Sequence, residues 1–241
     1  ILTYLDADGY VVGDITDLLY IEGDGMMARS RNSEEEFHVW SRNYRAGDEK
    51  GVIPKRVLDI WRENVNDLDT PKIQVTVTAC AYVFQKHHKP FLKLMMEHNE
   101  RIMGDSLNMY WLDNEAYPLT DESVLNSLLA FSSKAPSEVV DWKLDRYWDK
   151  HYAHFQGAAK PWVRWSKKHF KYFDMVMDTL DWVEKNNYKM MERPYSLRRS
   201  SKIMMFILAV LEDVYVQTRW RISRIYRIFK EKYTCMKEKF T

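Results

Sequence analysis

Cysteine is scarce in this chain of 241 residues, which contains only Cys80 and Cys235. Two cysteines are too few for a disulfide framework, and their separation does not fit a zinc site. We therefore expect free thiols in a reducing compartment. The sequence also has no Asn-x-Ser/Thr acceptor for N-glycosylation, which fits a cytosolic protein and leaves a lumenal location open.

An excess of charge of either sign is missing too. Lys and Arg number 36 and Asp and Glu 35, so the formal net charge is +1. This balance gives no support to an acidic substrate, and we expect no nucleic-acid partner. Long apolar runs are also missing. Residues 203–211 are apolar throughout but are followed by Glu212 and Asp213, so this run is too short to span a bilayer.

The chain has enough apolar residues for one sizeable core, or for one domain with an appended helical region, since 46% of its residues are hydrophobic. The first residue is Ile1 rather than Met, and the residues that follow already have the pattern of a buried strand, without a signal-peptide pattern. We expect the chain to be truncated at its N-terminus, so that any targeting or anchoring segment lies upstream.

Strand and helix patterns alternate over the first two thirds of the chain, which predicts an α/β fold. Apolar and β-branched runs predict strands at residues 1–5 and 10–12 and a central strand at residues 73–84. Apolar residues at helical spacing predict helices at residues 90–101 and 120–131. The second of these would begin with Thr120 as its N-cap and with acids in its first turn.

The segments between these elements are polar. Residues 15–20 predict a short helical turn, and residues 22–56 predict loops around one strand at residues 37–40.

After Trp162 the pattern changes to long helices with basic residues, at residues 165–186 and 200–240. We therefore divide the chain into an α/β domain, residues 1–165, and a basic helical C-terminal extension, residues 166–241.

Two aspartates, Asp6 and Asp8, stand at the C-terminal end of the first predicted strand. Alternate side chains of a strand project to the same side, and open α/β sheets bind ligands at this edge. Two carboxylates there repel each other unless a cation neutralises them, and oxygen ligands suit Mg²⁺ or Mn²⁺ together with substrate phosphates. The alternative is a pair of acids in a turn. The same spelling recurs at Asp67-Leu68-Asp69 without a leading strand, where we predict a loop.

A second segment with metal-binding and phosphate-binding residue types runs from His154 through Gly157 and Lys160 to Pro161-Trp162. A glycine permits close approach of the backbone to a phosphate, a lysine supplies a point charge, and an imidazole shifts an oxygen site from Mg²⁺ towards Mn²⁺. The alternative is a surface loop whose histidine caps a helix.

Three segments together resemble family 8 of the retaining glycosyltransferases, the group of glycogenin and the lipopolysaccharide galactosyltransferases. They are the D-x-D strand and turn from Leu5 to Leu18, the segment Thr120-Asp121-Glu122-Ser123-Val124-Leu125-Asn126, and the motif His154-Phe155-x-Gly157-x-x-Lys160-Pro161-Trp162. The third is the most specific. The resemblance covers roughly two thirds of the chain, to about Trp165, and makes residues 1–165 a partial catalytic domain.

The resemblance implies a nucleotide-sugar-binding mixed sheet of the GT-A type with flanking helices. It also implies transfer of a hexose from a UDP-sugar to a hydroxyl of a carbohydrate or protein acceptor, with retention of configuration. Mn²⁺, or Mg²⁺ in its place, would be bound by Asp6, Asp8 and His154.

Further residue roles follow from the same resemblance. Ala7 would belong to the cofactor-binding segment, Gly157 and Lys160 would hold the diphosphate, and Asp121 would bind hydroxyls of the donor sugar. The compartment stays open between the cytoplasm and the Golgi.

This chain departs from the family pattern at three places. Glu122 stands where the family has glutamine, so a carboxylate could stabilise an oxocarbenium-like transition state or mark a different sugar. Thr78-Ala79-Cys80 replaces Asn-x-Gly at the end of the middle strand. The family elements that bind uracil and ribose lie upstream of the D-x-D, so we expect these 241 residues alone to turn over poorly or fold badly.

The C-terminal extension offers alternatives to a purely catalytic role. Apolar residues from Ile222 to Tyr233 share one helical face opposite basic residues, which fits peripheral contact with an anionic membrane or packing on the catalytic domain. Aromatic residues from Trp162 to Phe173 could line an acceptor groove or simply pack. A non-catalytic scaffold that associates through its C-terminal helices is the competing class. A metal-dependent hydrolase is a weaker third, because no residue beside the acids is a clear candidate for activating water.

Overall fold

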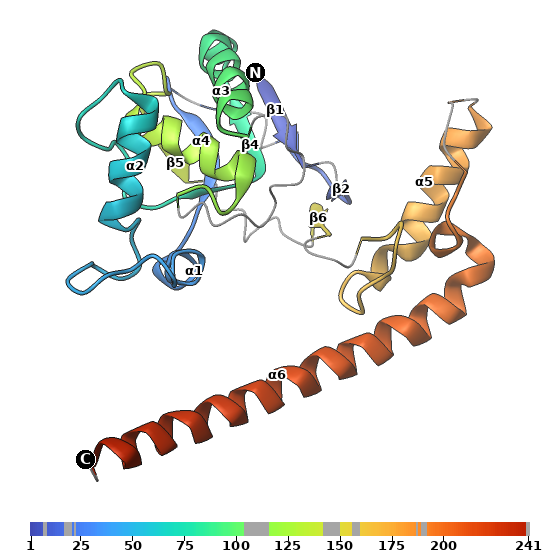
Figure 1. Cartoon of the computed structure of the whole chain (residues 1–241). Coiled ribbons are helices and arrows are strands. Elements are labelled where there is room, and N and C mark those ends of the chain that lie inside the picture. Colours follow the sequence, from blue (N-terminus) through green and yellow to red (C-terminus); the bar gives the residue numbers. More distant parts are fainter. Residues whose placement is uncertain are drawn as a thin grey trace. The chain divides into compact units, whose positions relative to one another are not determined.

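The computed structural model divides the chain into two compact units, Ile1–His154 and Phe155–Thr241 (Figure 1). It describes residues 1–6, 9–16, 21, 23–103, 116–141, 150–155, 160–186, 188 and 192–239, with side chains in the last helix up to residue 223. The boundary comes earlier than the predicted one after residue 165, because Phe155 already packs edge-on against Trp165 and His169, at ring-centroid distances of 6.0 and 5.0 Å.

The first unit contains both strands and helices, as the sequence predicts, but its described elements come in groups and do not alternate strictly. The strands are β1 (Leu2–Leu5), β2 (Gly9–Val11), β3 (Met26–Ser30), β4 (Val77–Phe84), β5 (Val139–Asp141) and β6 (Tyr152–His154). The helices are α1 (Ser33–Val39), α2 (Lys55–Val65), α3 (Lys89–Met103) and α4 (Thr120–Phe131).

Four of these strands form a mixed sheet in the order β1-β4-β3-β5. β4 is antiparallel to both β1 and β3, whereas β3 and β5 are parallel. The strand predicted to be central is therefore hydrogen-bonded on both sides, and the mixed α/β fold is confirmed. β2 and β6 pair separately as an antiparallel ribbon.

Helix α4 contacts β4, α2 and α3 (Figure 1). It is also bonded to the sheet through Asn126, whose side-chain amide accepts from the Val77 N–H at 2.7 Å and donates to the Val77 carbonyl at 2.9 Å. The core beside it contains Trp61, which donates to the Ala116 carbonyl at 2.7 Å and lies edge-on to Trp40. These contacts fix the start of α4 against the sheet.

The prediction of a strand at residues 37–40 is wrong, because these residues belong to the end of α1 and the turn after it. A capping box starts this helix: the Asn32 side chain accepts from the Glu34 and Glu35 N–H groups, and the Glu35 carboxylate accepts from the Asn32 N–H. Strand β3 and the first residues of α2 also lie inside the segment predicted as loops.

Helices α3 and α4 are confirmed close to their predicted bounds, but Thr120 does not act as an N-cap. Its φ is +45°, and it is the first residue of α4, which has no side-chain cap. The second D-x-D spelling is a loop as predicted: Asp67 follows α2 and accepts from the N–H and hydroxyl of Ser133.

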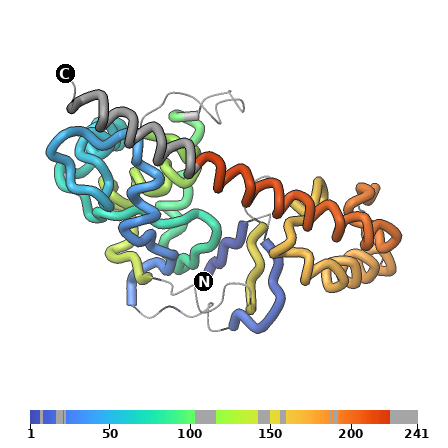
Figure 2. The backbone as a smooth tube through the Cα atoms, turned by 90° about the horizontal axis from the view of Figure 1, so that it is seen from below, coloured from blue at the N-terminus to red at the C-terminus, as the bar shows by residue number. Residues whose placement is uncertain are grey.

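The second unit contains α5 (Phe173–Lys185) and α6 (Lys202–Lys239), and α6 is one unbroken helix (Figures 1 and 2). The first predicted helix of this region is shorter than expected, because residues 170–172 form a 3-10 turn before α5. Trp165 and Phe173 are buried, which favours packing over an acceptor groove for these two rings. Among the described residues, no helix is both long enough and apolar enough to cross a bilayer.

Candidate functional site

Asp6 directly follows β1 and is fixed by its backbone. Its N–H donates to the Cys80 carbonyl of β4 at 3.0 Å, and its own carbonyl accepts from the Gly9 N–H at 2.9 Å. The second bond closes a turn that leads into β2. The Asp6 side chain remains 38% exposed, so its carboxylate is held at the sheet edge and is accessible from solvent.

His154 is the last residue of β6, and it pairs with Gly9 in the β2–β6 ribbon. Because β2 starts just after the turn at Asp6, this pairing brings the imidazole next to the Asp6 carboxylate. The His154 Nε2 lies 3.3 Å from the Asp6 Oδ2, and the ring is buried. The structure thus brings together two residues that the sequence separates by most of the first unit.

Tyr152 occupies the same face of β6 two residues earlier, and its ring is stacked on that of His154 at 6.2 Å. Its hydroxyl lies 3.4 Å from the carbonyl oxygens of both Asp6 and Cys80. Burial raises the pKa of Tyr152, and the nearby Cys80 and Asp6 raise it further. On the neighbouring strand β2, Gly9 leaves room for the Tyr152 ring, because a Cβ at Gly9 would stand 1.8 Å from the Tyr152 hydroxyl oxygen.

A second tyrosine pair lies beside the aspartate. Tyr4 of β1 and Tyr82 of β4 stack with ring centroids 4.4 Å apart. Burial raises the pKa of both hydroxyls, and the negative charges of Asp6 and Asp121 raise them further.

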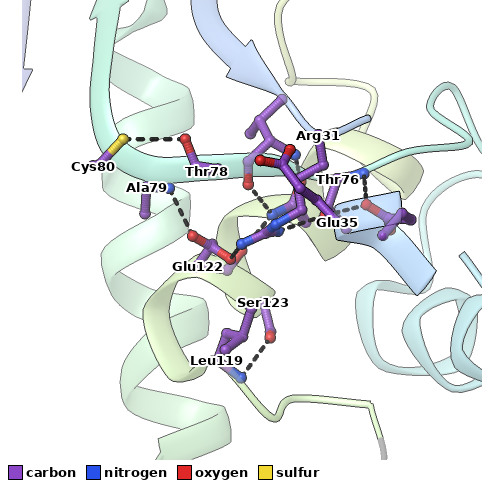
Figure 3. A network of polar contacts seen from close by, with 12 residues as sticks. Arg31, Glu35, Thr76, Thr78, Ala79, Cys80, Leu119, Glu122 and Ser123 are labelled. Carbon is purple, nitrogen blue, oxygen red and sulfur yellow. Dashed lines mark hydrogen bonds and ion pairs between the residues drawn. The ribbon is translucent and has the colours of Figure 1, made fainter. Parts of the chain in front are cut away.

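Asp121 is exposed at the start of α4 and accepts from the Thr120 hydroxyl at 3.0 Å. The next residue, Glu122, is largely buried and points the other way, toward the sheet. One of its carboxylate oxygens accepts from the Ala79 N–H at 2.9 Å, and the other forms an ion pair with Arg31 (Figure 3). Both oxygens of Glu122 thus have partners within the protein.

Arg31 connects this ion pair to the strands. Its guanidinium also donates to the Thr76 hydroxyl at 2.6 Å, just before β4 (Figure 3). The Thr78 hydroxyl and the Cys80 thiol lie 3.1 Å apart on the same strand, and burial raises the pKa of the thiol. The segment that departs from the family pattern is therefore tied to α4 through its backbone, at Ala79.

The remaining predicted site residues are not all placed. Ala7, Asp8 and Gly157 lie outside the described residues. Lys160 belongs to the second unit, where its carbonyl accepts from the Val163 and Arg164 N–H groups at the start of a turn.

Sequence reasoning missed the tyrosines and Arg31. Tyr152 could have been found from strand alternation, because a residue two positions before His154 shares its face. Tyr82 and Arg31 carry no such local signal, since their positions depend on how β4 pairs with its neighbours.

Comparisons with known proteins add no assignment: no family model, no curated protein and no solved structure matches this chain.

Proposed function

We propose that this chain carries the metal-binding part of a retaining hexosyltransferase that uses a UDP-sugar, on a sheet of the GT-A type. The observation that supports this best is the 3.3 Å separation of the Asp6 Oδ2 and the His154 Nε2. Two neighbouring ligands of one octahedral ion, with bonds of about 2.1 Å, lie roughly 3 Å apart. A carboxylate with an imidazole also fits the donor preference of Mn²⁺ better than that of Mg²⁺.

The proposed roles are those that the family resemblance implies for these residues. Asp6 and His154, with Asp8 as the predicted third ligand, would hold the cation. When bound, Mn²⁺ neutralises charge that develops on the nucleotide diphosphate leaving group. Asp121, which is exposed at the start of α4, would accept hydrogen bonds from hydroxyls of a donor sugar. The family resemblance also assigns the ammonium of Lys160 to the diphosphate, and this role stays a prediction.

Glu122 takes a positioning role in this proposal rather than a catalytic one. Its carboxylate is engaged by Arg31 and by the Ala79 N–H, so the negative charge that replaces the family's glutamine is balanced inside the protein. Direct stabilisation of a transition state by Glu122 stays a prediction.

The test measures Mn²⁺ binding by electron paramagnetic resonance together with UDP-hexose hydrolysis and transfer. The variants are Asp6→Asn, Asp8→Ala and His154→Ala, with Asp69→Ala in the second D-x-D spelling as the matched control. We expect the first three to lose Mn²⁺ affinity by at least about tenfold, because each removes a ligand. The control should bind like the wild type.

Two results would count against the proposal. Equal Mn²⁺ affinity in all four variants removes the shared metal site, even if the chain is too short to turn over. Product analysis separates the remaining classes, because a hydrolase releases free hexose in the presence of any acceptor, whereas a transferase extends the acceptor.

A second candidate function, association through α6, is favoured by the surface of that helix. Its first half exposes many large apolar side chains: Ile203, Met204, Phe206, Ile207, Leu208, Leu211, Val214, Tyr215, Val216, Trp220 and Ile222. A scaffold that associates through these side chains would form oligomers in light scattering, and Leu211→Ser with Val214→Ser would return it to a monomer. Sedimentation with anionic vesicles tests the membrane alternative on the same variants.

A further inference from the structure

A second group of metal-ligand side chains lies at the opposite end of the sheet from Asp6. The β1–β4 register pairs Leu5 with Ala81 and Leu2 with Phe84, so Asp6 lies toward the start of β4 and residues after Phe84 lie at its other end. At that other end β3 and β5 both begin, since Met26 pairs with Val139. The loop before β3 and the turn after β4 therefore meet there.

Three ligand-type side chains converge at this meeting point. Asp24 comes from the loop before β3, and His87 and His88 come from the turn after β4. One ligand atom from each lies within 4.8 Å of the other two. The His87 Nε2 is in direct contact with the Asp24 Oδ1, and the His88 Nε2 is 3.9 Å from the same oxygen. Around a common ion, such atoms would lie about 3 to 3.5 Å apart.

The two segments that carry these residues are held in place by other bonds. The Asp24 carbonyl accepts from the Ser137 hydroxyl at 3.2 Å, and the Gln85 side chain donates to the Gly23 carbonyl. His88 is buried, its ring lies edge-on to Phe84, and its Nδ1 accepts from the Gln85 N–H at 3.2 Å. These bonds keep the three ligand-type side chains beside one another at the end of the sheet.

The exposed side chains of Asp24 and His87 make this group accessible to a cation from solvent. The side chains of Asp24 and His87 are 69% and 53% exposed, so an ion can enter from solvent and keep water in its remaining coordination position. A carboxylate with two imidazoles is a ligand set for zinc, and three protein ligands leave its fourth tetrahedral position open.

We propose that Asp24, His87 and His88 form a Zn²⁺ site that joins the start of β3 to the end of β4, separate from the proposed hexosyltransferase site. The ion would be bound through the Asp24 carboxylate and the Nε2 atoms of both histidines. In the structure the His88 Nε2 lies 3.2 Å from the Asp24 carbonyl oxygen, and its Nδ1 accepts from the Gln85 N–H. Coordination through Nε2 moves the ring proton to Nδ1, so zinc binding replaces both of these hydrogen bonds. Because zinc binds the folded state, it raises the stability of the first unit by mass action.

The test titrates the whole chain with ZnCl₂ by isothermal calorimetry and by thermal unfolding. The variants are His87→Ala and Asp24→Asn, whose side chains are exposed and whose replacement should leave the fold intact by circular dichroism. His38→Ala is the matched control, because His38 is an exposed histidine beside a single acid, Glu34, at 3.9 Å. The zinc titrations are made in the His154→Ala background, because the site proposed at Asp6 and His154 would also bind Zn²⁺. In that background we expect one zinc ion per chain, with affinity at least about tenfold weaker in both variants and unchanged in the control.

A fourth variant, His154→Ala, separates the two metal proposals. It should lose Mn²⁺ binding but keep this zinc ion, whereas His87→Ala should do the reverse. Zinc stoichiometry and affinity that are the same in the His154→Ala background alone and with His87→Ala or Asp24→Asn added would overturn the proposal, as would a zinc-induced rise in unfolding temperature that survives both substitutions.

Discussion

The ion pair between Glu122 and Arg31 gives the sharpest stability prediction. In Glu122→Ala, the Ala79 N–H loses its acceptor and the Arg31 guanidinium loses its counter-ion. The side chain of Glu122 is only 14% exposed and that of Arg31 only 10%, so water replaces the lost partners poorly. Hydrogen bonds to charged groups each contribute about 1.5–3 kcal/mol, and Arg31 keeps its bond to Thr76. We therefore expect a loss of about 3 kcal/mol, reduced from the full sum by the residual exposure.

A loss of this size lowers the unfolding temperature of a chain this long by about 6–12 °C. The assay combines urea unfolding with amide hydrogen exchange, which should accelerate specifically at Ala79. Glu63→Ala, an exposed glutamate of α2, is the control. The reasoning is refuted if Glu122→Ala unfolds at the same urea concentration as Glu63→Ala and leaves the Ala79 amide protected. Loss of turnover without loss of stability would instead restore a catalytic role for Glu122.

Three further predictions concern the first unit. Burial, with the charge of Arg101, lowers the pKa of His98 to about 4, below its unfolded value of about 6.5. The folded state therefore resists protonation, so stability present above pH 6.5 should fall by up to about 3 kcal/mol as the pH drops toward 4. Urea unfolding at several pH values should show this slope in the wild type and a flatter one in His98→Gln. Gly9→Ala forces a methyl group against the buried Tyr152 ring and should cost about 1–3 kcal/mol, with weaker Mn²⁺ binding because the β2–β6 ribbon shifts. Calorimetry that finds both quantities unchanged would contradict the close contact. Asn126→Ala removes the side-chain amide that bridges α4 to both polar groups of Val77 and should cost about 2–4 kcal/mol in urea unfolding. A cost below about 0.5 kcal/mol would show that water replaces these bonds.

Elements with a long, regular pattern could be predicted from the sequence. Strand β4 is an eight-residue run that contains Val, Thr, Tyr and Phe, and α3 repeats apolar residues at helical spacing over four turns. The three-residue strands β5 and β6 were missed, because they carry too little pattern to stand out, although the equally short β2 was predicted within one residue. Helix α1 was mistaken for a strand because Phe37, Val39 and Trp40 dominate its end, although the capping-box residues Asn32 and Glu35 marked its start.

The candidate site was predictable only in part, for a related reason. The motif around His154 and the aspartate at the end of β1 could be recognised locally, and their chemistry suggested a common ion. The partners of Glu122 could not, because Arg31 reaches it only through the antiparallel pairing of β3 with β4. The proposed zinc ligands were missed likewise, since Asp24 and the two histidines become neighbours only when those same strands are aligned.

The pairing of Gly9 with His154 has a consequence for biosynthesis. These two residues are separated by almost the entire first unit, and the ribbon they form cannot close until the ribosome has released β6. Such remote pairings form slowly, because a large loop must be ordered before they contribute any stability. Nascent chains that stop short of His154 should therefore leave Asp6 without its imidazole neighbour, however well the larger sheet has already folded.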